Sequence, residues 1–129
     1  MLLADNLNQL LEIVPDFIRR PLKNHPKRKI LIEIVLDIGR RPEARFADGS
    51  EYLSYRTIVW QDLDYIVKRL GKFNDDNRAG IEKTLHRISS LRNRQGNIIG
   101  LTCRIGRAVF GTVSIVRDLL ENKKSILLL

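Results

Sequence analysis

Residues 29–38 read Lys-Ile-Leu-Ile-Glu-Ile-Val-Leu-Asp-Ile, and this stretch decides the fold. Its even-numbered positions are all Ile or Leu, whereas Glu33 and Asp37 fall on odd-numbered positions. Alternation with a period of two predicts a β-strand that has one buried face and one mixed face. We therefore expect residues 30, 32, 34, 36 and 38 to face the core of a sheet.

Turn signals on the C-terminal side of this stretch predict the neighbouring strands. Residues 39–42, Gly-Arg-Arg-Pro, are typical of a turn, and residues 43–46 predict a short return strand. Asp48-Gly49 is a strong hairpin signal. A third strand is then expected within residues 51–60, split near Arg56.

A second hairpin is expected over residues 86–107, with its turn at residues 94–97. In the second strand of that hairpin, apolar residues including Leu101 and Cys103 share one face. The other face carries Gly100, Thr102, Arg104 and Gly106, none of them large and apolar. Such a strand lets another backbone or a phosphate group approach closely.

Helices complete the predicted architecture. Apolar residues at spacings of three and four predict a helix from Leu3 to Val14 and others over residues 16–22, 61–70 and 113–121. Residues 73–85 predict a weaker helix interrupted by Gly80, and residues 125–129 predict a buried strand. The fold class is therefore α+β, a mainly antiparallel sheet with peripheral helices.

Composition narrows the classes of protein. A chain of 129 residues with 43% hydrophobic residues is one ordinary folded domain, not a disordered chain. No apolar run exceeds four residues, so we expect no membrane insertion, and the N-terminus lacks the pattern of a secretory signal. The single Cys103 excludes an internal disulfide. We expect no metal site and no catalytic residue.

The net charge of +8 is concentrated in one stretch. Residues 83–117 hold seven basic residues and no acidic one, whereas the rest of the chain is nearly neutral. Such a stretch is an electrostatic footprint for phosphate, carried either by a nucleotide or by a nucleic acid. Phe110 is its only aromatic residue, so the usual platforms for stacking bases are absent from it.

The chain resembles the N-terminal region of a cyanobacterial and plastid ATPase family, whose plastid members are called hypothetical chloroplast open reading frame forty-five. That family is similar to the bacterial stage III sporulation protein AA. The resemblance covers about residue 10 to the end, and its longest run is the basic hairpin. It is carried by residues 15–18, 37–46, 76–82, 85–88, 92–94, 98–110, 117–119 and 125–129.

This resemblance implies a domain division and partners. Residues 1–122 would be an N-terminal α+β domain, and residues 123–129 would begin a truncated P-loop ATPase domain of the AAA type. The parent protein would hydrolyse ATP with Mg²⁺, assemble into a homo-oligomeric ring and reside in the plastid stroma or in a cyanobacterial cytoplasm. This chain lacks the Walker motifs, so on its own it would bind neither cofactor.

The resemblance also implies a site hypothesis. N-domain arginines of the related secretion ATPases approach nucleotide held by the core. Here Arg92, Arg94, Arg104 and Arg107 lie on or beside the basic hairpin, and the planar donor fork of Arg suits phosphate. Two alternatives stay open: a nucleic-acid-binding module that contacts phosphates through residues 83–117, and an oligomer-forming domain that packs through the stripe from Leu3 to Val14.

Overall fold

The structure is a computed structural model that describes residues 2–4, 7–71, 73, 76–81 and 84–110. Its centre is a six-stranded antiparallel sheet with the order β4-β3-β2-β7-β6-β5. The strands of this sheet are β2 (Leu31–Asp37), β3 (Glu43–Phe46), β4 (Gly49–Tyr52), β5 (Arg78–Gly80), β6 (Arg87–Arg92) and β7 (Ile98–Arg104). The predicted α+β class and the antiparallel sheet are confirmed.

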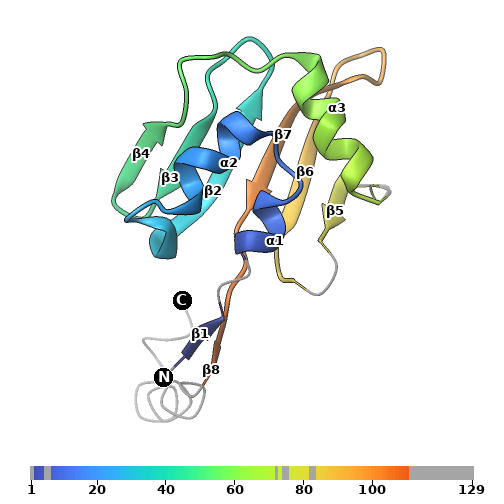
Figure 1. The fold of residues 1–129 in the computed structure, drawn as a ribbon. Helices are drawn as coiled ribbons and strands as arrows, with labels where there is room; N and C mark the ends of the chain where they lie inside the picture. Colours follow the sequence, from blue (N-terminus) through green and yellow to red (C-terminus); the bar gives the residue numbers. More distant parts are fainter. Residues whose placement is uncertain (1, 5–6, 72, 74–75, 82–83, 111–129) are drawn as a thin grey trace, which may run out of the picture.

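Three α-helices pack on one face of this sheet (Figure 1): α1 (Leu7–Leu11), α2 (Asp16–Lys23) and α3 (Trp60–Arg69). The core lies between the two layers, with Ile34, Leu36 and Leu101 from the sheet meeting Leu10 and Ile66 from the helices. A short 3₁₀ turn, η1 (Arg28–Ile30), leads into β2. None of the described helices is long and apolar enough to cross a lipid bilayer.

The local predictions that rest on turn and helix signals are confirmed. Strand β3 occupies residues 43–46 as expected, and the hairpin at Asp48-Gly49 closes through a pairing of Phe46 with Gly49. Helices α2 and α3 begin and end within one residue of the predicted bounds. Strands β6 and β7 form the predicted basic hairpin around residues 94–96.

The prediction for the face of β2 is wrong in part. Ile34 and Leu36 are buried as expected, but Ile30, Ile32 and Ile38 are each about two-fifths exposed, and Leu31 is buried instead. The cause is a β-bulge: Leu31 pairs with Phe46 and Glu33 pairs with the adjacent Arg45, which leaves Ile32 as the extra residue. The bulge shifts the alternation by one position.

Three further predictions are corrected by long-range pairing. Residues 2–4 are strand β1, paired with β8 (Ala108–Phe110), so the first helix begins at Leu7 and not at Leu3. Strand β4 ends at Tyr52, and the rest of the segment to residue 60 contributes a single parallel bridge from Ile58 to Ile38. The helix expected over residues 73–85 is wrong, because Arg78–Gly80 form β5 at the sheet edge.

The helix predicted over residues 113–121 and the strand over 125–129 lie outside the described residues. The same holds for the boundary at residue 122 and for the expected start of an ATPase core.

Candidate functional site

The face of the sheet opposite the helices is the candidate site, and strand register defines its surface. One row of paired residues crosses it as Gly80, Arg87, Arg104, Glu33, Arg45 and Ser50. The next row is Arg78, Ser89, Thr102, Val35, Glu43 and Tyr52. Paired residues point to the same side of a sheet, so polar and small side chains line this face where apolar ones line the core face.

Three arginines gather at one end of this face. Arg78, Arg87 and Arg104 come from the adjacent strands β5, β6 and β7, and all three are exposed. Together with Ser89 and Asp76 they line a cavity of about 530 Å³. Among the residues that the structure describes, no carboxylate forms an ion pair with any of the three arginines.

Arg87 and Arg104 are held close together by the backbone. They are direct cross-strand partners, and like charges in such positions are destabilising unless an anion lies between them. The Arg87 guanidinium lies over Gly80, where a Cβ would stand 3.0 Å from Nη1, and the same nitrogen donates to the carbonyl of His86 at 3.0 Å. Gly80 therefore makes room for the Arg87 side chain.

Arg104 also has an acidic neighbour, Glu33 on β2. The Glu33 carboxylate lies 3.7 Å from Arg45 Nη1, and the Glu43 carboxylate lies 3.2 Å from Arg45 Nε. Arg45 thus offsets part of the acidic charge of Glu33 and Glu43 in the middle of the face, whereas the positive charge of the three arginines is concentrated at the β5–β7 end.

Small residues form the floor of the middle of the face. A second cavity, of about 420 Å³, is lined by Ser89, Gly100, Thr102, Val35 and Asp37 among others. It shares Ser89 with the arginine cavity. The side chain of Asp37 lies against Gly100, at a place where a Cβ would collide with it. At Gly100 the close neighbour is thus a side chain and not the predicted backbone or phosphate, whereas the predicted approach of a backbone occurs at Gly106, where a Cβ would overlap the carbonyl oxygen of Leu85.

Tyr52 on β4 lies at the far end of the face, and Tyr55 follows three residues after the end of that strand. Tyr52 is 57% exposed and Tyr55 is 89% exposed. The Arg41 guanidinium lies over both rings, 4.3 Å from the centroid of Tyr52 and 4.5 Å from that of Tyr55, and Arg41 donates to the carbonyl of Ser54 at 2.9 Å. The Tyr52 edge lines a third cavity of about 220 Å³.

The four arginines predicted as phosphate contacts do not form one cluster. Arg104 lies in the arginine cavity. Arg92 and Arg94 lie at the tip of the β6–β7 hairpin, at the opposite end of these strands. Arg92 donates to Asn77 Oδ1 and to the carbonyl of Gly96, both at 2.9 Å.

Arg107 has a structural role. Its guanidinium donates to the carbonyl of Leu31 at 2.7 Å and to that of Arg28 at 2.6 Å. These bonds tie the end of the hairpin to the turn before β2, across nearly eighty residues of sequence. An arginine whose donors are committed to backbone carbonyls has few left for phosphate.

Sequence reasoning missed Arg78 and Arg87. The alternation of Arg87, Ile88 and Ser89 on β6 already places Arg87 on the outer face and could have identified it. Arg78 gave no such signal, because its segment has a helical spacing of apolar residues and reaches the site only through pairing with β6.

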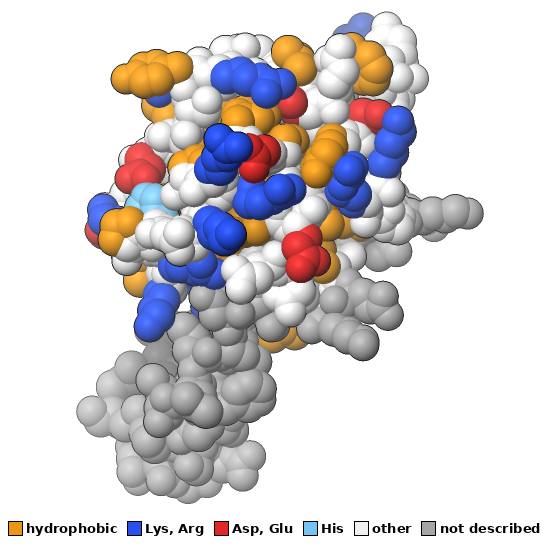
Figure 2. All heavy atoms as spheres, in the orientation of Figure 1, with side chains coloured by type: hydrophobic (Ala, Val, Ile, Leu, Met, Phe, Trp, Pro, Cys, Tyr) orange, Lys and Arg blue, Asp and Glu red, His pale blue; other side chains and the backbone are white. Residues whose placement is uncertain are grey.

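Basic residues on the helix-covered side differ from this cluster, since many have acidic partners. Figure 2 shows Lys and Arg side chains interspersed with Asp and Glu there. Arg20 lies 2.6 Å from Asp16, and Arg56 lies 2.9 Å from Asp62.

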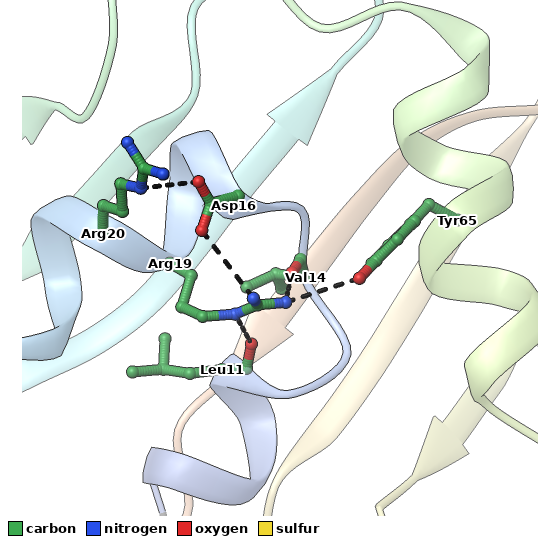
Figure 3. Close-up of polar contacts among 6 residues, drawn as sticks. All are labelled: Leu11, Val14, Asp16, Arg19, Arg20 and Tyr65. Carbon is green, nitrogen blue, oxygen red and sulfur yellow. Dashed lines mark hydrogen bonds and ion pairs between the residues drawn. The ribbon is translucent and has the colours of Figure 1, made fainter.

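Arg19 connects α1 to α2 and α3. It donates hydrogen bonds to the carbonyls of Leu11 and Val14 at 2.8 and 2.7 Å, and one to the Tyr65 hydroxyl at 3.4 Å (Figure 3).

Buried polar groups in the described part serve the fold. Burial raises the pKa of the Cys103 thiol to about 12, as expected for an inert core thiol. The buried Asp62 accepts the Val59 N–H at 2.9 Å at the start of α3, and His86 Nδ1 accepts the Gly106 N–H at 3.0 Å. Within the described residues, no group of three or more His, Cys, Asp or Glu side chains could hold a metal ion.

Comparison with known proteins identifies relatives along the whole chain. All 129 residues match an uncharacterized protein ycf45 of Porphyra purpurea at 71% identity and one of Cyanidium caldarium at 49%. The chain is a homologue of the ycf45 proteins. A third relative is the protein SEEDLING PLASTID DEVELOPMENT 1 of Arabidopsis thaliana, 48% identical over 95% of this chain. No family model and no solved structure matches.

These relatives support the predicted resemblance to the ycf45 family and a plastid location. The chain spans only part of each of them: 23% of the Porphyra ycf45 protein, 38% of the Cyanidium ycf45 protein and 18% of the Arabidopsis protein. The relation to AAA-type ATPases stays a prediction.

Proposed function

We propose that this chain is the N-terminal domain of a plastid P-loop ATPase. We also propose that the sheet face opposite the helices, called here the uncovered face because no described helix packs on it, binds the partner on which the ATPase acts. The observation that carries the proposal is the exposed arginine-bearing face on a sheet whose other face is fully used by the core. A domain that needs only one face for its stability has the other available for binding.

The extent of the relatives supports a larger parent protein. The shared segment makes up only 23% of the Porphyra ycf45 protein and 38% of the Cyanidium one, so both relatives are more than twice as long as this chain. The described residues form a sheet, a helix layer and a core, which is the organisation of a domain and not of a linker.

ATP and Mg²⁺ belong to the proposed ATPase core. This sequence has no Gly-x-x-x-x-Gly-Lys-Ser/Thr loop to cradle the phosphates, and the residues described here provide no cluster for the metal. The residues of this chain therefore do not fit these cofactors, and we assign them no step in hydrolysis. Of the four arginines predicted from the sequence, we retain Arg104 as a binding residue.

The test is ATP turnover of a hybrid protein in which this chain replaces the matching segment of the Porphyra ycf45 protein. We expect the hybrid to release phosphate from ATP in the presence of Mg²⁺. The 129-residue chain alone is the control and should release none. A well-folded hybrid that neither binds nor hydrolyses ATP would contradict the proposed function.

A further inference from the structure

We propose that Arg78, Arg87 and Arg104 bind phosphate groups of a single-stranded nucleic acid that lies along the uncovered sheet face. This inference rests on the proposed function, because it names the chemical class of the partner. It is carried by the arginine cavity, by the small-residue floor beside it and by the tyrosines at the far end of the face.

The arginine cavity has the chemistry of a phosphate site. Each guanidinium offers five N–H donors in a planar fork that matches two phosphate oxygens. Arg87 donates to one backbone carbonyl, and among the described residues neither Arg78 nor Arg104 has an ion-pair partner. Asp76 is the one acidic residue in the lining of the cavity. A phosphate between Arg87 and Arg104 would relieve the repulsion that their register imposes.

The rest of the face favours an extended chain over an isolated phosphate. The arginine cavity continues into the second cavity through Ser89, and the second cavity shares Val35, Asp37 and Arg45 with the cavity beside Tyr52. Five strand spacings separate β5 from β4, a path of about 24 Å. That length suits roughly four nucleotides, the lower end of what one small sheet domain binds.

The side chains along the path suit exposed bases. Thr102 and Ser89 leave the floor low, and the Asp37 side chain lies against Gly100. The carboxylates of Asp37 and Glu33 in this cavity can accept hydrogen bonds from base amino groups. Arg41 covers one side of each tyrosine ring, so that a base can stack on the other side. Stacking requires unpaired bases, and this favours a single strand over a duplex.

The experiment is fluorescence anisotropy of a labelled single-stranded 12-mer titrated with the 129-residue chain. We expect binding at low salt, with a slope of log K against log salt of about −2 for three phosphates. The variant Arg87→Ala/Arg104→Ala should lose about tenfold in affinity per arginine and reduce the magnitude of the slope by about 1.4, which leaves the contribution of about one phosphate. Tyr52→Ala should weaken binding without changing the slope.

The matched control is Arg20→Ala/Lys68→Ala, which removes two charges from α2 and α3 on the covered side. It should bind nearly as the unchanged chain does, and circular dichroism verifies that every variant is folded. The inference is overturned if the 12-mer does not bind at low salt, or if the two double variants lose affinity equally. It is also overturned if a duplex binds as tightly as the single strand or more tightly, or if AMP binds and the 12-mer does not. ATP turnover of the hybrid is measured without nucleic acid, so the two proposals fail separately.

Discussion

Replacing Ile34 with alanine is expected to lower the free energy of unfolding by about 2–5 kcal/mol. Ile34 is fully buried on β2, between Ala44 and Cys103 on the neighbouring strands. Removing its side chain loses apolar burial and leaves a cavity beneath the helices, where the close-packed surroundings relax only in part. Urea denaturation followed by circular dichroism measures the loss.

Ile32→Ala is the matched control, because it removes the same atoms two residues away. Ile32 is 43% exposed at the bulge of β2, so we expect a loss of about 1 kcal/mol or less. If the alternation along residues 30–38 were strict, alanine at either position would lower the free energy of unfolding by the same amount. Equal losses at Ile32 and Ile34 would therefore contradict the bulge.

Gly106→Ala is expected to cost about 3 kcal/mol, at the upper end of overpacking effects. A Cβ at this position would overlap the carbonyl carbon and oxygen of Leu85, which are backbone atoms and cannot rotate away. The resulting shift would also separate the Gly106 N–H from His86 Nδ1, which it now meets at 3.0 Å. Urea denaturation of the variant measures this cost.

Gly71→Ala is the control for the loss of a glycine as such. No atom lies within 4 Å of a Cβ at Gly71, and its φ lies outside the left-handed region. Its replacement should leave stability unchanged or raise it by up to about 1 kcal/mol. A Gly106 variant as stable as the Gly71 variant would show that the hairpin does not pass so close to Leu85.

Elements with local signals could be predicted from the sequence. The Asp48-Gly49 turn, the Gly at position 96 and the helical apolar spacing of residues 61–70 depend on interactions within a few residues. The corresponding hairpins and α3 are found at or within one residue of the predicted places.

Elements that depend on distant partners could not be predicted in this way. Strand β5 takes three residues from a segment with helical spacing, because β6 offers it a free edge. Strand β1 exists only through its pairing with β8. The bulge at Ile32 arises from pairing with β3, which the period of β2 alone does not reveal.

The candidate site, like the fold, could be predicted from the sequence only where local signals mark it. The acid-free stretch of residues 83–117 contains Arg87 and Arg104, two of the three arginines of the cluster, but only Arg104 was predicted as a contact residue. Arg107 belongs to the same stretch but is used by backbone carbonyls of β2 and η1. Tyr52 lies more than thirty residues upstream of that stretch, so only the sheet order brings an aromatic residue to the face.

Thiol labelling of a Ser89→Cys variant tests most directly whether the uncovered face binds a partner. Ser89 is exposed and lines both the arginine cavity and the second cavity. The buried Cys103, with its pKa raised to about 12, gives no background. The variant Arg20→Cys, on α2 at the helix-covered side of the sheet, is the control.

We predict that a single-stranded oligonucleotide at about ten times its Kd slows labelling of Ser89→Cys about tenfold, because only the free form then reacts. Labelling of Arg20→Cys should not change. Unchanged labelling at Ser89→Cys under conditions where the oligonucleotide is bound, or equal slowing at both positions, would contradict the account.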